Sequence, residues 1–439
     1  MRYRHRQKDS TMMQNTISRR SWMAACSTAT LAPWGQALSA SSNDPLPVGA
    51  VVTVYRTNSH ADVIVGKILE GWQQKGGPGP NLKIVSLYAD QVPQGDLSRG
   101  LAKKHGFRLA KTIDEALTLG TDQLQVRGVL SIGEHGDYPR TAKTHQHQYP
   151  RLRFFERIVS AMERVGQVAP VFNDKHFSHR WRDGRYMVDT ARQMGFPLMA
   201  GSSLPVAWRY PGLQLPQNAE IESALTIGYG GMESYGFHAL ETHQCMIERR
   251  AGGETGTRSV QAVQGDAIWK AEGDGRWSRQ LLQAALDTLP SYNKAASIKD
   301  TLNEGAKRSF LGRPTFYLID SRDGLQSTVA MVPGLASQFA FAAKIKGQEK
   351  PVATWFKLQE VQPFSHFAYL LRGINHMFHT GQPAYPAERT LLTTGILDRA
   401  MQSAAAGGKA LQTPELNISY RGTDWPYAND PRSPLKIEI

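Results

Sequence analysis

Short apolar runs alternate with helical patterns between residues 48 and 200, and this alternation restricts the possible folds more than any other feature. Apolar runs typical of buried strands occupy residues 48–55, 83–88, 126–132, 168–172 and 197–200. The intervening segments show helical spacing, as in Ile64, Ile68 and Trp72, with Asn58 or Ser59 available as an N-cap. Strands alternating with helices predict a doubly wound parallel sheet. We therefore expect a Rossmann-type domain over residues 47–202.

The pattern changes after residue 203. Further strands are predicted at residues 219–229, 259–263, 315–319, 326–332 and 339–346, and the turn Ser321–Gly324 separates two of them. Helices are expected at residues 236–249, 364–379 and 387–405, and the polar stretch 287–308 is expected to be a surface excursion. Residues 203–415 thus predict an α+β domain with a mostly antiparallel open sheet that carries substrate and oligomer contacts, followed by a tail at 416–439.

Length and charge restrict the class of protein further. A chain of 439 residues is too long for one ordinary core, which agrees with two domains. Much of the net charge of +13 is local, because the first forty residues hold six basic residues against the single acidic Asp9. The remaining basic residues are scattered without interleaved aromatics, which argues against nucleic-acid binding. Apolar runs long enough to span a membrane are also absent from the sequence.

The first forty residues resemble an export signal. Ser18–Met23 contains Arg19-Arg20 in a twin-arginine context, a weakly apolar run follows, and Ala37-Leu38-Ser39 offers a cleavage site near Ala40. We therefore expect export to the periplasm. A disordered basic tail is the alternative, and lipid anchoring at Cys26 is a variant of the export hypothesis. Without this segment Cys245 is the only cysteine, so a disulfide within one mature chain is excluded.

Two motifs carry a resemblance to a known family. Val171–Gly201 runs from a strand through Asn173-Asp174-Lys175-His176 into an amphipathic helix and a final strand. It resembles the strand, Glu-Lys-Pro turn, helix and strand of the Gfo/Idh/MocA family, which comprises glucose–fructose oxidoreductase, inositol dehydrogenase and MocA. Lys175 matches the family lysine, Asp174 replaces the glutamate, and His176 replaces the proline.

The second motif is Tyr229–Glu241, which resembles the family's glycine-rich strand end followed by an Asp-x-x-x-His-x-x-Asp helix. His238 matches the histidine, Glu241 replaces the second aspartate one helical turn later, and Ser234 stands where the first aspartate is usual. Glu233 is a possible substitute for that aspartate, but strand alternation would point it elsewhere. Tyr235 falls in the same segment, where the family binds substrate.

The resemblance implies NAD-linked oxidation or reduction of a sugar, polyol or sugar derivative by a homo-oligomer. Lys175 and His238 would move the proton, with His238 acting as acid or base and Glu241 holding one imidazole tautomer. Asp174, His176 and Ser234 would support them. The helix after Pro386 resembles the family's C-terminal helix, which packs back against the first domain.

The predicted cofactor site keeps one element of the usual pattern and lacks another. The first turn, Thr53–His60, has no glycine, so Tyr55, Arg56 and Asn58 stand where G-x-G-x-x-G would admit a diphosphate. Arg56 could compensate by binding phosphate. Asp90 ends the second strand, where an acid binds the ribose and favours NAD over NADP. Glu134 and His135 follow a further strand, near the expected nicotinamide position.

Several alternatives remain open on the sequence alone. The carboxylates and imidazoles of the predicted cleft could bind a divalent metal, although no short metal-binding signature occurs and no metal is favoured. A non-redox carbohydrate lyase or isomerase, or a binding protein that has lost its chemistry, could share this fold. Trp208 and Arg209 could line a sugar site by stacking and hydrogen bonding, or form a wall between the domains. His145 and His147 are expected to be solvated.

Overall fold

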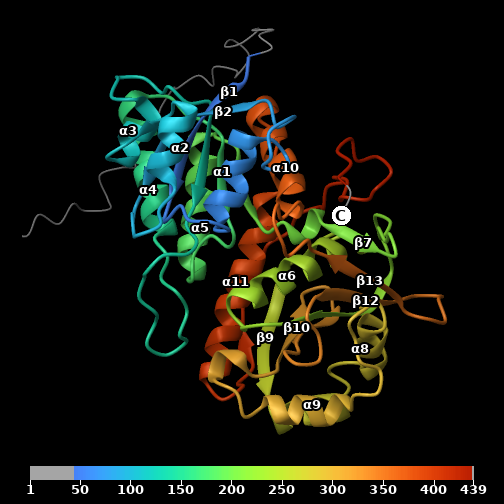
Figure 1. Cartoon of the computed structure of the whole chain (residues 1–439). Coiled ribbons are helices and arrows are strands. Elements are labelled where there is room, and N and C mark those ends of the chain that lie inside the picture. The colour runs from blue at the N-terminus through green and yellow to red at the C-terminus, as the bar shows by residue number, and fades with distance from the viewer. Residues whose placement is uncertain (1–43, 438–439) are drawn as a thin grey trace, which may run out of the picture. The chain divides into compact units, whose positions relative to one another are not determined.

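The computed structural model describes residues 44–437, so the predicted export segment lies outside the described residues. The first part of the described chain contains a six-stranded sheet (Figure 1). Its strands are β1 (Leu46–Val52), β2 (Leu82–Ala89), β3 (Arg108–Leu109), β4 (Gly128–Ile132), β5 (Val171–Asp174) and β6 (Leu198–Gly201). Their spatial order is β3-β2-β1-β4-β5-β6 and every pairing is parallel. This is the strand order of a Rossmann-type sheet, and it agrees with the doubly wound parallel sheet that the alternation predicted.

Helices cover both faces of this sheet, which explains why its strands are apolar without alternation. They are α1 (His60–Glu70), α2 (Ser98–His105), α3 (Ile113–Thr118), α4 (Arg151–Val165) and α5 (Trp181–Met194). Successive side chains of β1 face opposite cores: Val51 packs with α3, α4 and α5, whereas Ala50 and Val52 pack with α1. The Ser59 hydroxyl caps α1 by accepting from the Asp62 N–H, as predicted.

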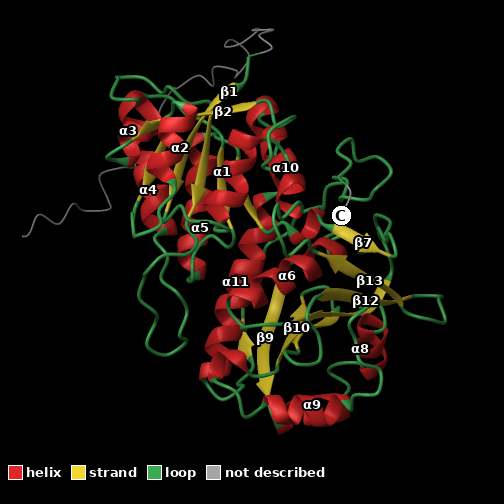
Figure 2. Ribbon diagram, viewed as in Figure 1, coloured by secondary structure: helices red, strands yellow, loops and turns green. Residues whose placement is uncertain are grey.

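The second sheet has eight strands and is mostly antiparallel. Its strands are β7 (Trp208–Tyr210), β8 (Ile221–Gly228), β9 (Thr257–Gln264), β10 (Thr315–Ser321), β11 (Gln326–Met331), β12 (Phe339–Ile345), β13 (Val352–Lys357) and β14 (Leu411–Gln412). Their order is β14-β9-β10-β11-β8-β12-β13-β7, and only the β8–β11 pair is parallel. The predicted α/β plus α+β fold is therefore confirmed (Figure 2). The predicted domain boundary at residue 202 stays a prediction.

Both faces of the second sheet are also covered. One face packs against α6 (Ser234–Ile247) and α11 (Ala387–Ala405), and the other against α7 (Asp266–Gly273), α8 (Arg279–Leu286) and α9 (Ile298–Gly305). The expectation that residues 287–308 form a surface excursion is thus wrong in part, because Leu289 and Leu302 are buried in this second core. Apolar residues at helical spacing within a polar segment were the missed signal.

Two C-terminal helices connect the two sheets. Helix α10 (His366–Thr380) packs beside α1 in the core of the first sheet. Helix α11 contacts α5 and β6 as well as α6 and β9, as the resemblance implied for the helix after Pro386. The segment after it returns to the first core, where Ala428 and Ile437 are buried. Among the described residues, no helix is long and apolar enough to cross a membrane.

Candidate active site

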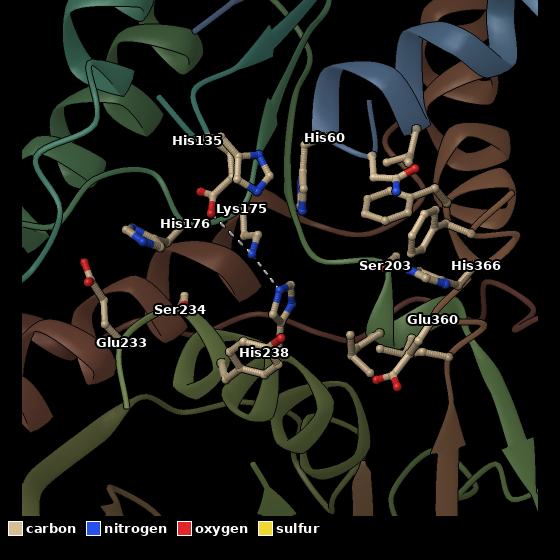
Figure 3. Close-up of a pocket in the computed structure, with 18 of the residues that line it drawn as sticks. His60, His135, Lys175, His176, Ser203, Glu233, Ser234, His238, Glu360 and His366 are labelled. Atoms are coloured by element: carbon tan, nitrogen blue, oxygen red, sulfur yellow. Dashed lines mark hydrogen bonds and ion pairs between the residues drawn. The ribbon is translucent and has the colours of Figure 1, made fainter. Parts of the chain in front are cut away.

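A pocket of about 600 Å³ lies at the carboxyl ends of β1, β4 and β5, beside the start of α6 (Figure 3). Parallel strands of a doubly wound sheet direct the loops that follow them to this edge, where such folds bind ligands. The predicted residues that line the pocket are Asn58, Glu134, His135, Lys175, His176, Ser234, Tyr235 and His238. The pocket thus brings together residues of the two motifs, Val171–Gly201 and Tyr229–Glu241.

Lys175 reaches the pocket through a strained turn. Its φ is +67°, in the left-handed region that non-glycine residues rarely occupy. The Asn173 side-chain amide donates to the carbonyls of Asp174 and His176, both at 3.3 Å, and so holds this turn. The Lys175 Nζ lies 2.7 Å from His238 Nε2, in a largely buried position. The two predicted catalytic residues, 63 positions apart, therefore form a direct hydrogen bond.

The geometry also selects one form of the His238 ring. Burial, followed by the charge of Lys175, holds the pKa of His238 well below its usual value, so the ring is neutral. Because the Lys175 ammonium only donates, Nε2 must accept, and Nδ1 carries the proton. The Nδ1–H then donates to Ser202 Oγ at 2.6 Å, which also accepts from the Leu204 N–H at 3.1 Å.

Glu241 does not hold this tautomer, and that expectation is wrong. Its buried carboxylate accepts from Thr393 Oγ1 at 2.7 Å, Thr390 Oγ1 at 3.2 Å and the Ser202 N–H at 3.3 Å. Helix α11 supplies the two threonines, so Glu241 points away from the imidazole although it is one turn beyond His238. Burial raises the pKa of Glu241. Glu241 therefore joins the helices behind the site, and Ser202 contacts the ring.

Glu134 and Arg151 form a buried ion pair at one wall. Glu134 also lies 3.6 Å from Lys175 Nζ, and Arg151 lies 3.1 Å from His176 Nε2. Burial raises the pKa of Glu134, but the charges of Lys175 and Arg151 outweigh it and hold that pKa well below its usual value. Burial and then Arg151 lower the pKa of His176, which is neutral. The wall therefore presents a fixed carboxylate beside the lysine.

A carboxylate–imidazole pair joins the turn of Lys175 to α1. Asp174 Oδ2 lies 2.7 Å from His60 Nδ1, and the His60 ring is in edge contact with His135 at 5.3 Å between centroids. Burial and then His60 lower the pKa of His135 to about 4, so His135 is neutral at physiological pH. Sequence reasoning did not select His60 or Arg151. Their position at the first residue of a helix that starts at this sheet edge was the available signal.

Glu233 also faces the pocket, contrary to the expectation from strand alternation. Strand β8 ends at Gly228, and the following residues turn through Gly230 at φ +73°, so the two-residue period no longer applies. Glu233 Oε1 accepts from the His147 N–H at 2.7 Å. Burial raises the pKa of Glu233 to about 7. His147 lines the pocket with 26% of its side chain exposed, whereas His145 is exposed, so the prediction that both are solvated holds only in part for His147.

Aromatic rings form the opposite side of the pocket. Tyr235 and Phe339 stack at 15° with 6.4 Å between centroids, and Tyr229 meets Tyr235 edge-on at 4.8 Å. Glu360 accepts from the Tyr229 hydroxyl and also lines the pocket. These rings and carboxylates are suited to a hydroxylated ring, because CH groups pack on aromatic faces while hydroxyl groups donate to carboxylates.

Trp208 and Arg209 do not line this pocket, so the suggestion that they bind substrate there is wrong. Trp208 is buried against Tyr369, with 5.0 Å between ring centroids. The Arg209 guanidinium donates to the backbone carbonyls of Pro205 and Leu213, both at 2.9 Å. Strand β7 is the edge of the second sheet and turns these side chains into the protein, as the alternative of a wall between domains implied.

Three of the predicted cofactor residues, Tyr55, Arg56 and Asp90, do not line the pocket. The Tyr55 ring is fully buried in the core under α1, and the Arg56 side chain is exposed. Asp90 accepts from the hydroxyls of Tyr88 at 2.8 Å and Tyr138 at 2.7 Å, and pairs with Arg153 at 2.7 Å. The role of Asp90 as a ribose ligand stays a prediction.

Comparison with models of protein families finds no match, and comparison with curated proteins finds none either. Solved structures do match. GenD2 from gentamicin A biosynthesis, in complex with NAD, aligns at a TM-score of 0.52 and 15% identity, covering 84% of this chain and 96% of that one. A scyllo-inositol dehydrogenase from Lactobacillus casei aligns at 0.52 and 11%, covering 84% and 99%. A putative myo-inositol dehydrogenase from Sinorhizobium meliloti 1021 aligns at 0.50 and 13%, also covering 84% and 99%.

The chain has the inositol dehydrogenase fold. The similarity runs through both sheets, because the alignments cover 84% of this chain and nearly the whole length of each of the three proteins. The Gfo/Idh/MocA-type architecture that the two motifs implied is therefore confirmed at the level of fold. Among residues 44–437, no group of three or more His, Cys, Asp or Glu side chains is placed to hold a metal ion.

Proposed function

We propose that this protein is an oxidoreductase that transfers hydride between NAD and a hydroxyl-bearing carbon of a sugar, polyol or sugar derivative. The observation that carries the proposal is the Lys175–His238 hydrogen bond of 2.7 Å inside the pocket, at the sheet edge where this fold binds ligands. The NAD complex of GenD2, which shares the fold, supports the choice of cofactor. The two motifs support the choice of substrate class.

Lys175 and His238 together transfer the proton of the reacting hydroxyl group. Lys175 can donate to the substrate oxygen and pass a proton to His238 Nε2 as it takes one from the substrate hydroxyl. Ser202 keeps the Nδ1–H of His238 bonded, and Glu134 at 3.6 Å stabilises positive charge on the lysine. Bound NAD would supply the hydride acceptor or donor. In the direction of reduction the same residues return the proton to the substrate.

Two features of the pocket fit a dinucleotide. Asn58, His60 and Val63 at the start of α1 line the pocket, and the N–H groups of His60 and Ala61 have no acceptor within the described part of the chain. Such a helix terminus attracts phosphate without help from glycine. His135 Nδ1 is buried and has no hydrogen-bond partner in that part of the chain either. We propose that α1 holds the diphosphate and that His135 contacts the nicotinamide end.

Direct cofactor binding is the first test of this proposal. Calorimetric titration of the purified protein with NAD, NADH, NADP and NADPH should show saturable binding of NAD or NADH, followed by hydride transfer with a panel of sugars and polyols. Mass spectrometry of the supernatant after denaturation would reveal a dinucleotide that co-purifies. Absence of binding at millimolar concentrations of all four dinucleotides would contradict the proposal.

Ser202→Ala tests the tautomer that the geometry selects. The variant removes the acceptor of the His238 Nδ1–H, and loss of one such hydrogen bond corresponds to a decrease in kcat of about tenfold. We expect KM to stay nearly constant while the pH profile of kcat shifts, because the ring loses the partner that fixes its proton. Ser98→Ala, at a buried serine remote from the pocket, is the control. An unchanged pH profile would remove Ser202 from the proton pathway.

The raised pKa of Glu233 should make the stability of the protein depend on pH. Its pKa is about 7 in the folded protein, above the usual value of 4.5, so the folded state binds the proton more tightly than the unfolded state. This stabilisation is complete below about pH 4.5 and is lost as the pH rises through 7. The free energy of unfolding should fall by about 3 kcal/mol over this range. Urea unfolding at pH 5 and pH 8 should show a smaller decline for Glu233→Gln than for the parent chain. Parallel declines would contradict the prediction.

We also propose that the protein is exported through the twin-arginine route and acts as a homo-oligomer. Arg19-Arg20 within the basic first forty residues supports export, and the family resemblance supports assembly. Fractionation of cells that express either the full chain or a double variant of the signal, Arg19→Lys with Arg20→Lys, would test export. Equal amounts of both proteins in the periplasmic fraction would contradict the twin-arginine route. Light scattering of the purified protein would give its oligomeric state.

A further inference from the structure

Arg209 carries a buried charge without a counter-ion. Its guanidinium lies between the rings of Phe356 and Tyr427, at 4.9 and 4.5 Å from their centroids, and is almost completely buried. Its terminal nitrogens donate to carbonyl oxygens, but no carboxylate of residues 44–437 lies within 4.0 Å of it. Asp430 pairs with Arg432 at 2.7 Å, which lowers the pKa of Asp430 more than the charge of Arg209 does. A buried charge of this kind is costly unless an anion balances it.

Three unsatisfied donors line one small cavity beside this guanidinium. They are Arg209 Nε, the Tyr385 hydroxyl and Trp425 Nε1, each buried and without a hydrogen-bond partner within the described part of the chain. The cavity measures about 20 Å³. A cavity of that size is large enough for one water molecule or one monatomic ion. Guanidinium and indole groups can only donate, so the occupant must chiefly accept.

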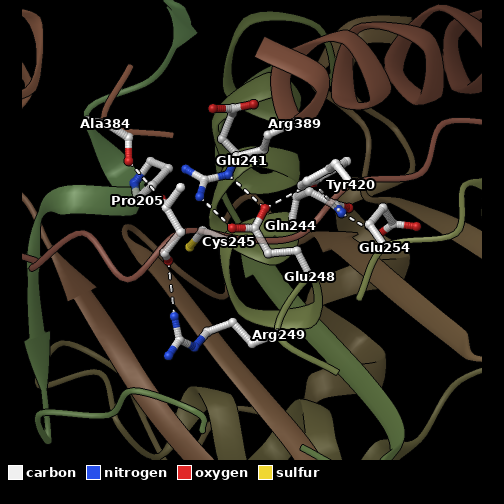
Figure 4. Close-up of polar contacts among 12 residues, drawn as sticks. Pro205, Glu241, Gln244, Cys245, Glu248, Arg249, Glu254, Ala384, Arg389 and Tyr420 are labelled. Atoms are coloured by element: carbon white, nitrogen blue, oxygen red, sulfur yellow. Dashed lines mark hydrogen bonds and ion pairs between the residues drawn. The ribbon is translucent and has the colours of Figure 1, made fainter. Parts of the chain in front are cut away.

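The other charges around the cavity do not supply the missing anion (Figure 4). Arg389 and Arg249 also line it, and the only carboxylate among the lining residues is Glu248. Glu248 already accepts hydrogen bonds from Arg389 at 2.8 Å and from the Tyr420 hydroxyl at 2.9 Å. Cys245 Sγ lies 3.8 Å from Arg209, but burial raises the pKa of its thiol to about 11, so it is uncharged.

We propose that this cavity binds one small monovalent anion, such as chloride, contacted by Arg209 Nε, the Tyr385 hydroxyl and Trp425 Nε1. A water molecule could accept from Arg209 Nε and Trp425 Nε1 and donate to the Tyr385 hydroxyl, but it would leave the charge of Arg209 unbalanced, which an anion would not. The anion would join β7, the segment before α11 and the C-terminal tail, which supply the three donors. The site is separate from the catalytic pocket and does not depend on the proposed function.

The test is thermal unfolding of the full chain in sodium gluconate and in sodium chloride or bromide at equal ionic strength. We expect a saturable rise in Tm with halide, because an ion that binds only the folded state favours folding by about tenfold when its concentration is ten times its Kd. Crystals grown with bromide should show one anomalous peak in the cavity. Equal Tm values in all three salts, with no anomalous peak, would mean that water fills the cavity and would overturn the proposal.

Two variants locate the effect. Arg209→Met should abolish the halide dependence. Tyr385→Phe, which removes one donor and keeps the ring, should weaken it several-fold and covers the case in which Arg209→Met does not fold. Tyr317→Phe is the matched control, since its buried hydroxyl donates to the Met232 carbonyl elsewhere. If Tyr385→Phe and the parent chain respond equally to halide, the ion binds at another place and the assignment is wrong.

Discussion

Lys175→Ala should lower kcat by about 10²–10⁴-fold while the fold stays intact. Lys175 contacts His238 Nε2 at 2.7 Å, and no other lysine lines the pocket among residues 44–437. The fold should survive because Glu134 keeps its ion pair with Arg151 and alanine meets the same backbone constraint as lysine. Steady-state kinetics with the substrate found by screening, together with circular dichroism melting, would measure both effects.

Two further variants separate the roles of Lys175. Lys175→Met keeps most of the side-chain volume, so a similar loss of kcat would assign the effect to the ammonium rather than to a cavity. Lys104→Ala, at an exposed lysine paired with Glu70, should leave kcat unchanged. Activity of Lys175→Ala equal to that of the parent chain would remove this lysine from the mechanism.

Arg151→Met should destabilise the protein by about 3–5 kcal/mol. Arg151 is fully buried and pairs with Glu134, so its removal leaves a buried carboxylate with Lys175 at 3.6 Å as its main remaining partner. The loss should be larger at pH 7 than at pH 4, because the pKa of Glu134 is held well below its usual value by Lys175 and Arg151 and should rise when Arg151 is removed. Urea unfolding at the two pH values would measure it.

A matched control lies two residues further along the same helix. Arg153 pairs with Asp90 at 2.7 Å but is half exposed, so Arg153→Met should cost less than about 1 kcal/mol. Adding Glu134→Gln to Arg151→Met should recover part of the lost stability, since the second change removes the unpaired charge. If Arg151→Met and Arg153→Met cost the same, the buried pair does not stabilise the fold as proposed.

The sequence by itself determined the architecture and the centre of the site. Alternating strands and helices gave the parallel sheet because both signals are local and depend on neighbouring residues. Lys175 and His238 could be selected because each belongs to a short motif that resembles the family, although the two motifs follow strands of different sheets. The helix after Pro386 was predicted with its bounds unchanged, since its apolar spacing is regular.

Only the tertiary structure decided which side chains complete the site. His60, Arg151 and Ser202 reach Asp174, Glu134 and His238 across 114, 17 and 36 residues of sequence, and no local pattern records such distances. Glu233 was expected to point away from the pocket but lines it, because the turn through Gly230 ends the two-residue period of the strand. Glu241 was expected to contact His238 but instead accepts hydrogen bonds from threonines of α11. Trp208 and Arg209 were turned inward by the edge strand that carries them. Side-chain direction depends on which elements pack together, and packing is the part of a fold that a single sequence states least directly.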